Sequence, residues 1–357
     1  MPSATDRPPS APPAPPSQPA GAPVRRLIRQ FTPSERVEGI FTISNAQLGR
    51  TKQDKPFLKC LIGDKTGQLP ARMWSIEPAL FKRLPTDGFV WLEGETQPYQ
   101  GELQVIVHNI EPAEPTSEML CDLMPCSSRD PEEMFSELTM LLGTLAHPAA
   151  RALAGVYLAD QQLMDAFKKC PAAKSMHHAY LGGLLEHTLG LCKLCDVVCP
   201  LYPKISRDVV LLGLFLHDLG KTRELIYDRT FSYSDRGELI GHIVDGAIML
   251  HDKAQQVMRA TGQRLPRNLV LVLQHIILSH HGVPEFGAAK LPMSPEAMLV
   301  SMLDNLDAKM YMALTAARPE TTMTDAGDQT GEALRGNFTE RQWALDTKLF
   351  RPDPLAE

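Results

Sequence analysis

The chain has 357 residues, of which 43% are hydrophobic and 22% are charged, and its formal net charge is -6. These values are typical of a globular protein with room for two domains, and the negative charge argues against a protein that coats nucleic acid by bulk electrostatics. No apolar run reaches the roughly 18 to 20 residues needed to cross a bilayer, and the N-terminus lacks the apolar core of a signal peptide. We therefore expect a cytoplasmic protein with no membrane partner. Seven cysteines, an odd number without an export signal, predict reduced thiols.

Residues 1–23 are rich in Pro, Ala and Ser and offer little to bury, so they predict a disordered tail, with a Pro-rich docking ligand as the alternative. From 24 to 112 the pattern changes to short alternating segments separated by Gly, Asp and Pro. Strands are expected at 36–44, 56–64, 67–74, 89–95 and 102–110, with a helix over 75–84. This order predicts a small all-β OB-type barrel, a fold that commonly binds single-stranded nucleic acid.

Period-two alternation predicts which side chains of the second and third strands face outward. Phe57 and Lys59 then lie beside Arg72 and Trp74, next to a loop with further cations. Aromatic rings stack on bases while cations follow the phosphates, so this face predicts single-strand binding. The candidate residues are Lys52, Lys55, Phe57, Lys59, Arg72 and Trp74. The alternative is that Trp74 packs under the helix and the lysines are ordinary solvated charges.

Residues 113–130 contain two prolines and no clear periodicity, which predicts a linker. The chain from 131 to 318 is dominated by long apolar-periodic stretches and predicts an all-α domain. Helices are expected at 132–145, 149–169, 179–198, 207–220, 239–261, 266–281 and 295–316. The polar segment 319–357 is interpreted as a partly ordered C-terminal tail.

Residues 211–221, LLGLFLHDLGK, place the adjacent pair His217 and Asp218 at the end of an apolar helix, where polar groups are costly to bury without compensation. Nine of the eleven histidines fall between residues 177 and 281. Residues in comparable positions make up the candidate ligand set: His187, His217, Asp218, His242, His280, His281 and Asp304. Any one of these histidines alone is equally well explained as a hydrogen-bonded core residue, but the set together predicts a metal site.

Neutral imidazoles and carboxylates suit Mn²⁺, Fe²⁺, Co²⁺, Ni²⁺ or Zn²⁺, and a carboxylate shared by two ions sets them about 3.5–4 Å apart. We therefore expect two ions with Asp218 as the bridge. Such ions can hold a phosphodiester oxygen and activate a water for in-line attack on phosphorus. Lys221, one helical turn beyond Asp218, is expected to offset the charge that builds on the phosphate, so Asp218 and Lys221 are the candidate catalytic residues.

Other histidines and one lysine lie outside this candidate ligand set and are expected to have other roles. Lys174, His177 and His178 are expected to line a substrate pocket as phosphate or base contacts. The histidines without such a context are predicted to be structural or surface residues: His108, His147, His251 and His275.

The cysteine motif of Cys192, Cys195 and Cys199 resembles a cluster or zinc site, but its spacing places all three on one helix face and favours core packing. The sequence contains neither a P-loop nor a GxGxxG string. Their absence argues against an ATP-driven mechanism.

The helical part carries five strings in order: HHAYLGGLLEHT (177–188), HDLGK (217–221), GELIGH (237–242), ILSHHG (277–282) and DNLDAKM (304–310). They follow PFLKCLIGDKTG (56–67) of the barrel. Over about residues 30–312 the chain resembles the YhaM-type 3'-5' exoribonucleases, which belong to the HD superfamily of metal-dependent phosphohydrolases.

The resemblance implies an OB-type barrel over 24–112 followed by an all-α HD-superfamily domain over 131–318. It implies 3'-5' hydrolysis of single-stranded RNA, with single-stranded DNA as a second candidate substrate, and a divalent metal, commonly Mn²⁺. By position, one ion would be held by His187, His217, Asp218 and Asp304, and a second would be completed by His242, His280 and His281.

Two rival functions stay open. Other HD proteins act on free nucleotides or cyclic dinucleotides, although the attached strand-binding barrel argues against that activity here. The chain could also be a non-catalytic single-strand-binding factor with a vestigial metal site. The resemblance leaves open whether the chain forms a homo-oligomer.

Overall fold

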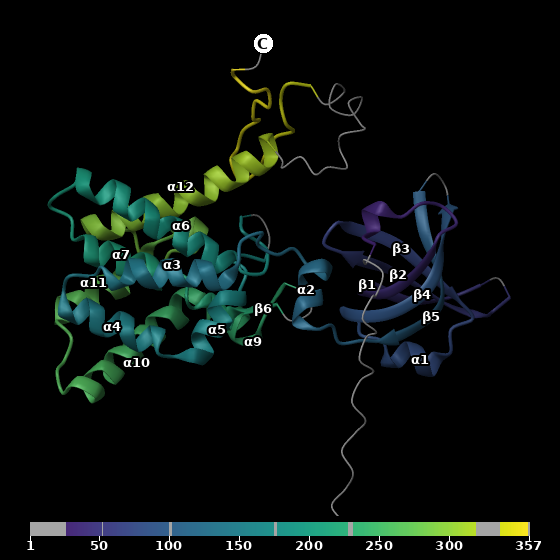
Figure 1. Ribbon diagram of the computed structural model, residues 1–357, viewed down its shortest axis with the longest axis horizontal. Helices are drawn as coiled ribbons and strands as arrows, with labels where there is room; N and C mark the ends of the chain where they lie inside the picture. The colour runs from purple at the N-terminus through teal and green to yellow at the C-terminus, as the bar shows by residue number, and fades with distance from the viewer. Residues whose placement is uncertain are drawn as a thin grey trace, which may run out of the picture.

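The computed structural model describes residues 26–51, 53–99, 102–174, 177–227, 231–318 and 336–355. A barrel and a helical domain lie side by side, with the helix α2 between them (Figure 1). The predicted tail over 1–23 and the candidate Lys52 lie outside the described residues. Among the helices that the structure describes, none is long and apolar enough to span a membrane.

Five strands form a closed barrel in the order β1-β2-β3-β5-β4. They are β1 (Arg36–Arg50), β2 (Pro56–Asp64), β3 (Gly67–Trp74), β4 (Gly88–Tyr99) and β5 (Glu102–Pro112). Alternation along β2 turns Leu58, Cys60 and Ile62 into the barrel, where all three are buried. The helix α1 (Pro78–Arg83) lies between β3 and β4. The predicted strands and helix are confirmed, and β1 and β4 run longer than predicted.

The segment 113–130, predicted to be a linker, contains α2 (Ser117–Leu123). Leu123 packs against Phe89 of the barrel, and Lys65 in the turn between β2 and β3 forms an ion pair of 2.6 Å with Asp122. The segment then meets the helical domain, because Ser127 N–H donates to the carbonyl of Leu181. The same short segment therefore contacts both domains.

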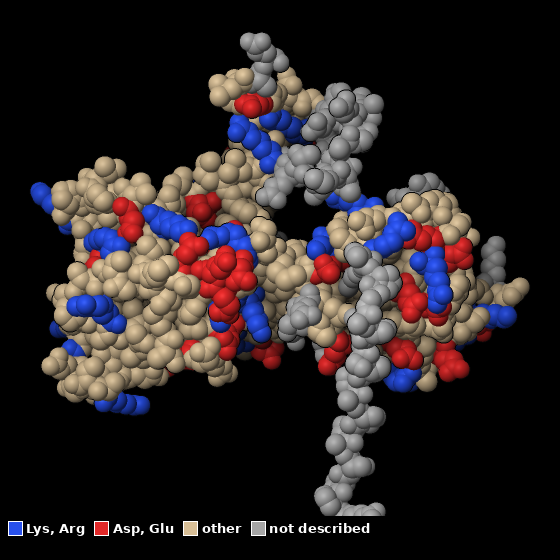
Figure 2. Space-filling view, in the orientation of Figure 1, with Lys and Arg blue, Asp and Glu red and all other residues tan. Residues whose placement is uncertain are grey.

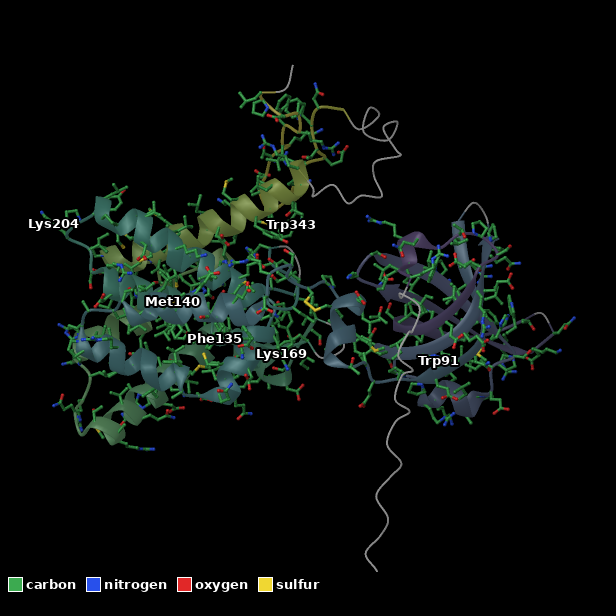
Figure 3. The ribbon with its side chains drawn as sticks, in the orientation of Figure 1. Trp91, Phe135, Met140, Lys169, Lys204 and Trp343 are labelled. Carbon is green, nitrogen blue, oxygen red and sulfur yellow. A yellow bond between two sulfur atoms is a disulfide. The ribbon has the colours of Figure 1, made fainter. Side chains whose placement is uncertain are left out.

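A disulfide joins Cys121 to Cys126 in this segment, between the two domains (Figure 3). The expectation of reduced thiols is wrong for this pair, whose Cα atoms lie 5.2 Å apart, within the range that a disulfide spans. The motif cysteines Cys192, Cys195 and Cys199 are free and buried in the helical core, as predicted.

Ten helices are described after α2. They are α3 (Pro131–Gly143), α4 (Pro148–Leu158), α5 (Gln161–Lys169), α6 (Gly183–Val198), α7 (Arg207–Leu216), α8 (Lys221–Glu224), α9 (Asp235–Leu239), α10 (Gly241–Thr261), α11 (Arg267–Ser279) and α12 (Pro295–Ala317). A hairpin of β6 (Leu225–Ile226) and β7 (Ser232–Tyr233) lies between α8 and α9. Single 3-10 turns lie at Ile28–Gln30, Cys199–Leu201 and Pro284–Phe286.

Helix α7 is the centre of this domain. Every residue from Val210 to Leu216 is buried, as expected for a helix that is apolar all round. It packs against α6, α11 and α12, so the residues that follow it enter the interior of the domain.

The predicted single helix over 149–169 is wrong, because α4 and α5 are separate. Asp160 interrupts the stretch: its carboxylate accepts a hydrogen bond from Leu163 N–H as the N-cap of α5, a position that Asp favours. The same carboxylate pairs with Lys253 of α10 at 2.7 Å. The break therefore coincides with a local N-cap and with an ion pair between residues far apart in the sequence.

Candidate metal centre and strand-binding face

The candidate ligands come from five helices and meet in the interior. His187 lies in α6, His217 and Asp218 directly follow α7, and Asp304 lies in α12. His242 lies in the first turn of α10, while His280 and His281 directly follow α11. The structure therefore gathers all seven residues of the predicted set around one position.

Glycine permits the close approach of two of these helices. A Cβ at Gly220, in the HDLGK turn, would lie 2.1 Å from the carbonyl oxygen of His242. Only glycine lets the turn after α7 rest on the first turn of α10. The turn thus brings Asp218 within 3.5 Å of the His242 ring.

Asp218 is the centre of the cluster, and its two carboxylate oxygens face different histidines. Oδ1 lies 3.5 Å from His242 Nε2 and 3.4 Å from His280 Nε2. Oδ2 lies 3.3 Å from His217 Nε2. On the other side, Asp304 Oδ1 lies 3.2 Å from His187 Nε2 and 3.9 Å from His217 Nε2.

Among the described residues, potential ligand atoms form three groups, within each of which all atoms lie within 4.8 Å of one another. His178, His187 and Asp307 make up one group. Of the other two, one holds Asp218, His242, His280 and His281, and the second holds His187, His217 and Asp218. Asp218 belongs to both of the latter groups. This placement is what a carboxylate bridging two ions requires.

The Nδ1 atoms of the histidines are held by oxygen atoms of the protein. His217 donates to the carbonyl of Leu214 at 2.7 Å and His280 to that of Ile277 at 2.8 Å. His281 donates to the carbonyl of Phe286 at 2.6 Å. With the proton on Nδ1, the lone pair of Nε2 points into the cluster, which is the tautomer that a metal-ligating histidine needs.

Carboxylates hold Nδ1 in the other two histidines. His242 Nδ1 lies 2.9 Å from Glu224 Oε1, and His187 Nδ1 lies 2.7 Å from Asp307 Oδ2. Carboxylate–histidine pairs of this kind orient the ring and raise its basicity as a ligand.

Several buried polar atoms of the cluster make no hydrogen bond within the described residues. They are Nε2 of His187, His217, His242 and His280, and Oδ1 of Asp218. Buried polar atoms are costly unless they are satisfied, and these lie around one position. Nitrogen and carboxylate ligands that converge in this way fit divalent transition metals.

The charge states of the cluster suit cation binding. Burial opposes the ionisation of Asp218, but Lys221 and His217 overcome it and hold the pKa of Asp218 well below its ordinary value. Burial lowers the pKa of His281 to about 4 and also lowers that of His280. At neutral pH Asp218 is thus ionised and His280 and His281 are neutral, which are the forms that bind metal ions.

His187 differs from these two histidines. Burial lowers its pKa, but the nearby carboxylates of Asp304 and Asp307 outweigh burial and raise it to about 9. The carboxylates that favour the imidazolium would equally favour a metal cation at the same position.

Lys221 is buried, and its Nζ lies 2.7 Å from Asp218 Oδ2. Burial lowers its pKa, yet the charge of Asp218 more than offsets this and the pKa is raised. The ammonium group is thus charged and held beside the cluster, where it was expected.

Of the three predicted substrate-pocket residues, His177 and His178 lie near the His187 ring, whereas Lys174 points to Tyr233. The His177 ring lies 5.9 Å from that of His187, and His178 is buried with Nε2 3.1 Å from Asp307. Lys174 instead projects over the ring of Tyr233, with Nζ 5.4 Å from the ring centroid.

Sequence reasoning missed Glu224 and Asp307, the two carboxylates that orient histidines. Asp307 lies three residues after Asp304 in DNLDAKM and therefore on the same face of α12. Glu224 likewise lies three residues after Lys221. This spacing was the available signal for both residues.

The predicted strand-binding face has its two aromatic residues together. Phe57 pairs with Trp74 across β2 and β3, with ring centroids 5.4 Å apart, and Trp74 is 48% exposed. Trp74 is therefore not covered by α1, and the alternative that it packs under the helix is wrong.

Cations lie next to this aromatic pair. Lys59 and Arg72 are partners in the register, and the Arg72 guanidinium lies 4.7 Å from the ring centroid of Tyr99. Lys55 is exposed at the start of β2. Figure 2 shows basic and acidic side chains interspersed on the visible face of both domains, so this face is not uniformly basic.

The histidine and aspartate cluster on an all-α scaffold defines the class of the helical domain. The family model of the HD domain matches residues 184–309, a span that includes the cluster from His187 to Asp304. One relative, the 3'-5' exoribonuclease YhaM of Shouchella clausii strain KSM-K16, is 32% identical over 330 residues. The matched region covers 90% of this chain and 95% of the relative.

The chain therefore belongs to the YhaM family of 3'-5' exoribonucleases. It is an enzyme with a five-strand barrel followed by a helical HD domain, and its HD domain carries a His/Asp metal-binding cluster. The resemblance drawn from the sequence strings is confirmed.

Proposed function

We propose that the protein is a metal-dependent 3'-5' exonuclease that hydrolyses single-stranded RNA to nucleoside 5'-monophosphates. The observation that carries the proposal is the set of buried, unsatisfied Nε2 atoms and carboxylate oxygens around Asp218. The name of the relative, a 3'-5' exoribonuclease, supports the direction and the substrate. Single-stranded DNA is the second candidate substrate.

We assign the ligands of one ion to His187, His217, Asp218 and Asp304, and those of the second to His242, His280 and His281 with Asp218 as the bridge. Mn²⁺ is the proposed ion, with Co²⁺, Fe²⁺, Ni²⁺ and Zn²⁺ as alternatives that the same ligands accommodate. When bound, such ions act as Lewis acids toward the phosphate and make water a better nucleophile.

In the proposed reaction water adds to the last phosphorus and the bond from that phosphorus to the 3' oxygen of the preceding nucleotide breaks. The 3' oxygen takes up a proton, so the shortened strand ends in a hydroxyl and the phosphate leaves with the released nucleotide. Lys221, held charged beside Asp218, offsets negative charge on the phosphate. His177 and His178, and in an altered rotamer Lys174, are the proposed contacts to the terminal nucleotide.

The barrel, over 24–112, is proposed to hold the strand upstream of the site in the HD domain, over 131–318. Phe57 and Trp74 supply rings for stacking, while Lys55, Lys59 and Arg72 supply cations; Lys52 belongs to the same proposal. A groove at the domain junction supports a path between the two domains, because it is lined by Ser44 and Gln68 of the barrel and by Ala179, which directly follows His178.

The test is a time course with 5'-labelled single-stranded RNA and Mn²⁺. The proposal predicts a ladder of successively shorter labelled products, its abolition by chelator, and no shortening of a strand whose 3' hydroxyl is blocked. Labelled fragments of one internal size, or an intact strand with every divalent metal tried, would overturn it. Faster hydrolysis of free nucleotides or cyclic dinucleotides in a competition assay would favour the rival HD activity.

A further inference from the structure

A chain of hydrogen-bonded side chains runs from the segment between the domains to the His187 ring. Ser127 Oγ donates to Glu186 Oε2 at 2.6 Å, and the Tyr180 hydroxyl lies 2.9 Å from the same oxygen. The Tyr180 hydroxyl is also 2.7 Å from His178 Nδ1. Each of these contacts is short enough to be a hydrogen bond.

This series of hydrogen-bonded side chains ends on Asp307. Its Oδ2 lies 3.1 Å from His178 Nε2 and 2.7 Å from His187 Nδ1, so one carboxylate oxygen accepts from both rings. A carboxylate oxygen 2.7 Å from a ring nitrogen accepts a hydrogen bond, so the contact places a proton on His187 Nδ1.

His178 is held in an unusual backbone conformation. Its φ is 47°, in the left-handed region, and its side chain is buried. A Cβ at Gly183 would lie 2.1 Å from the His178 carbonyl oxygen, and the His178 ring lies 4.2 Å from that of Tyr311. A strained residue that tight packing fixes in place is a feature of functional sites.

We propose that Asp307 and His178 are positioning residues that fix the tautomer and orientation of His187 as a metal ligand, and that Tyr180, Glu186 and Ser127 extend this support to the interdomain segment. The inference rests on the proposed metal site but concerns residues outside the assigned ligand set. Asp307 makes Nδ1 the protonated nitrogen, which leaves Nε2 free to bind a cation beside Asp304.

The segment containing Ser127 also contains α2, which packs on the barrel. The position of the barrel and the position of His187 are thus linked through consecutive contacts. A shift of the segment that broke the contact from Ser127 to Glu186 would loosen the support of His187.

The test is calorimetric titration of the full-length, metal-free protein with Mn²⁺, and with Co²⁺ for its visible absorption spectrum, without RNA. In Asp307→Asn the amide NH₂ can turn toward His187 Nδ1, which puts the ring proton on Nε2. We expect metal affinity to fall about 10- to 100-fold, the range found when such supporting partners are changed, and the Co²⁺ spectrum to shift. The matched control is Asp252→Asn, an exposed aspartate of α10.

Tyr180→Phe removes only the hydroxyl between His178 and Glu186 and is expected to weaken metal binding less than Asp307→Asn does. Its control is Tyr202→Phe, since Tyr202 is 53% exposed. Thermal unfolding in chelator checks that each variant folds. If Asp307→Asn does not fold, Tyr180→Phe alone decides the question.

Affinities and spectra equal to those of the controls would overturn the proposal. If Asp307→Asn bound one ion fewer than the wild type while its affinity for the remaining ions was unchanged, Asp307 would be a metal ligand, and this result would also overturn the proposal. Since no RNA is present, a wild-type protein that binds metal normally but hydrolyses no RNA would refute the proposed function and leave this inference standing.

Discussion

Replacing Trp74 with alanine is expected to weaken the binding of single-stranded RNA without changing the chemical step. Trp74 is 48% exposed and lies beside Phe57, with ring centroids 5.4 Å apart. The pair therefore offers an open stacking surface, and it lies on the barrel rather than in the helical domain that holds the candidate metal ligands. Stacking of a base on an aromatic side chain contributes about 1–3 kcal/mol, which corresponds to a rise in Kd of about 5- to 140-fold. Loss of the contact with Phe57 should lower the free energy of unfolding by only about 1 kcal/mol.

The assay is a fluorescence-anisotropy titration of 5'-labelled RNA with protein in chelator, so that the strand stays intact. Trp343→Ala is the matched control, because Trp343 is 79% exposed and lies by the C-terminal end of α12 rather than on the barrel (Figure 3). Trp74→Ala should raise Kd, and KM when metal is present, while kcat is unchanged. Equal Kd values for the two variants and the wild type would refute the assignment of this face.

Three further changes test other parts of the account. Asp218→Asn keeps the side-chain shape but removes the bridging charge, so kcat on RNA should fall about 1000-fold or more, and near-wild-type turnover would contradict the assigned role. Arg72→Ala should reduce the slope of log Kd against log salt by about 1 if Arg72 contacts a phosphate, whereas an unchanged slope would exclude that contact. Asp245 is 2% exposed and is paired with Arg236. Burial would raise its pKa, but the hydrogen bond from Arg236 and the charges of Arg223 and Arg236 outweigh burial and lower it. Its contribution is fully present above the unfolded pKa and is lost as pH falls through the lower folded pKa. Asp245→Asn should therefore lower the free energy of unfolding by about 1–3 kcal/mol at pH 7, and by progressively less as pH falls below about 4, in urea denaturation. A difference that stays constant with pH would contradict this.

The sequence predicted the barrel well because each strand carries its own signal. Alternation in PFLKCLIGD and GQLPARMW, with the turn DKTG between them, defines both the strands and the faces of their side chains. Leu58 and Ile62 are buried and Trp74 is exposed, as the alternation required. Closure of β3 on β5 through Ala71 and Val105 has no such local signal.

The candidate ligands that meet in the interior were predictable for a related reason. His217 and Asp218 are polar residues in an apolar context, and that contrast is visible in the sequence alone. Glu224 and Asp307 lie three residues after Lys221 and Asp304, a spacing that is visible in the sequence, but the spacing does not say which groups their carboxylates face. Only the fold shows that each faces a histidine ring.

The break between α4 and α5 has one weak local signal. Residues 149–169 keep a helical period through Asp160, and only the preference of Asp for the N-cap position marks the break in the sequence. The ion pair of Asp160 with Lys253 of α10 is a tertiary contact at the same point that the local pattern does not show. The disulfide between Cys121 and Cys126 is a similar case, because spacing alone does not pair cysteines.

The most direct test of the central claim is the number of metal ions bound per chain, measured by elemental analysis on the same samples whose nuclease activity is assayed. The account predicts two Mn²⁺ ions per fully active chain, loss of activity as chelator removes them, and recovery when Mn²⁺ is restored. Full activity on RNA in a protein from which all metal has been removed would contradict it.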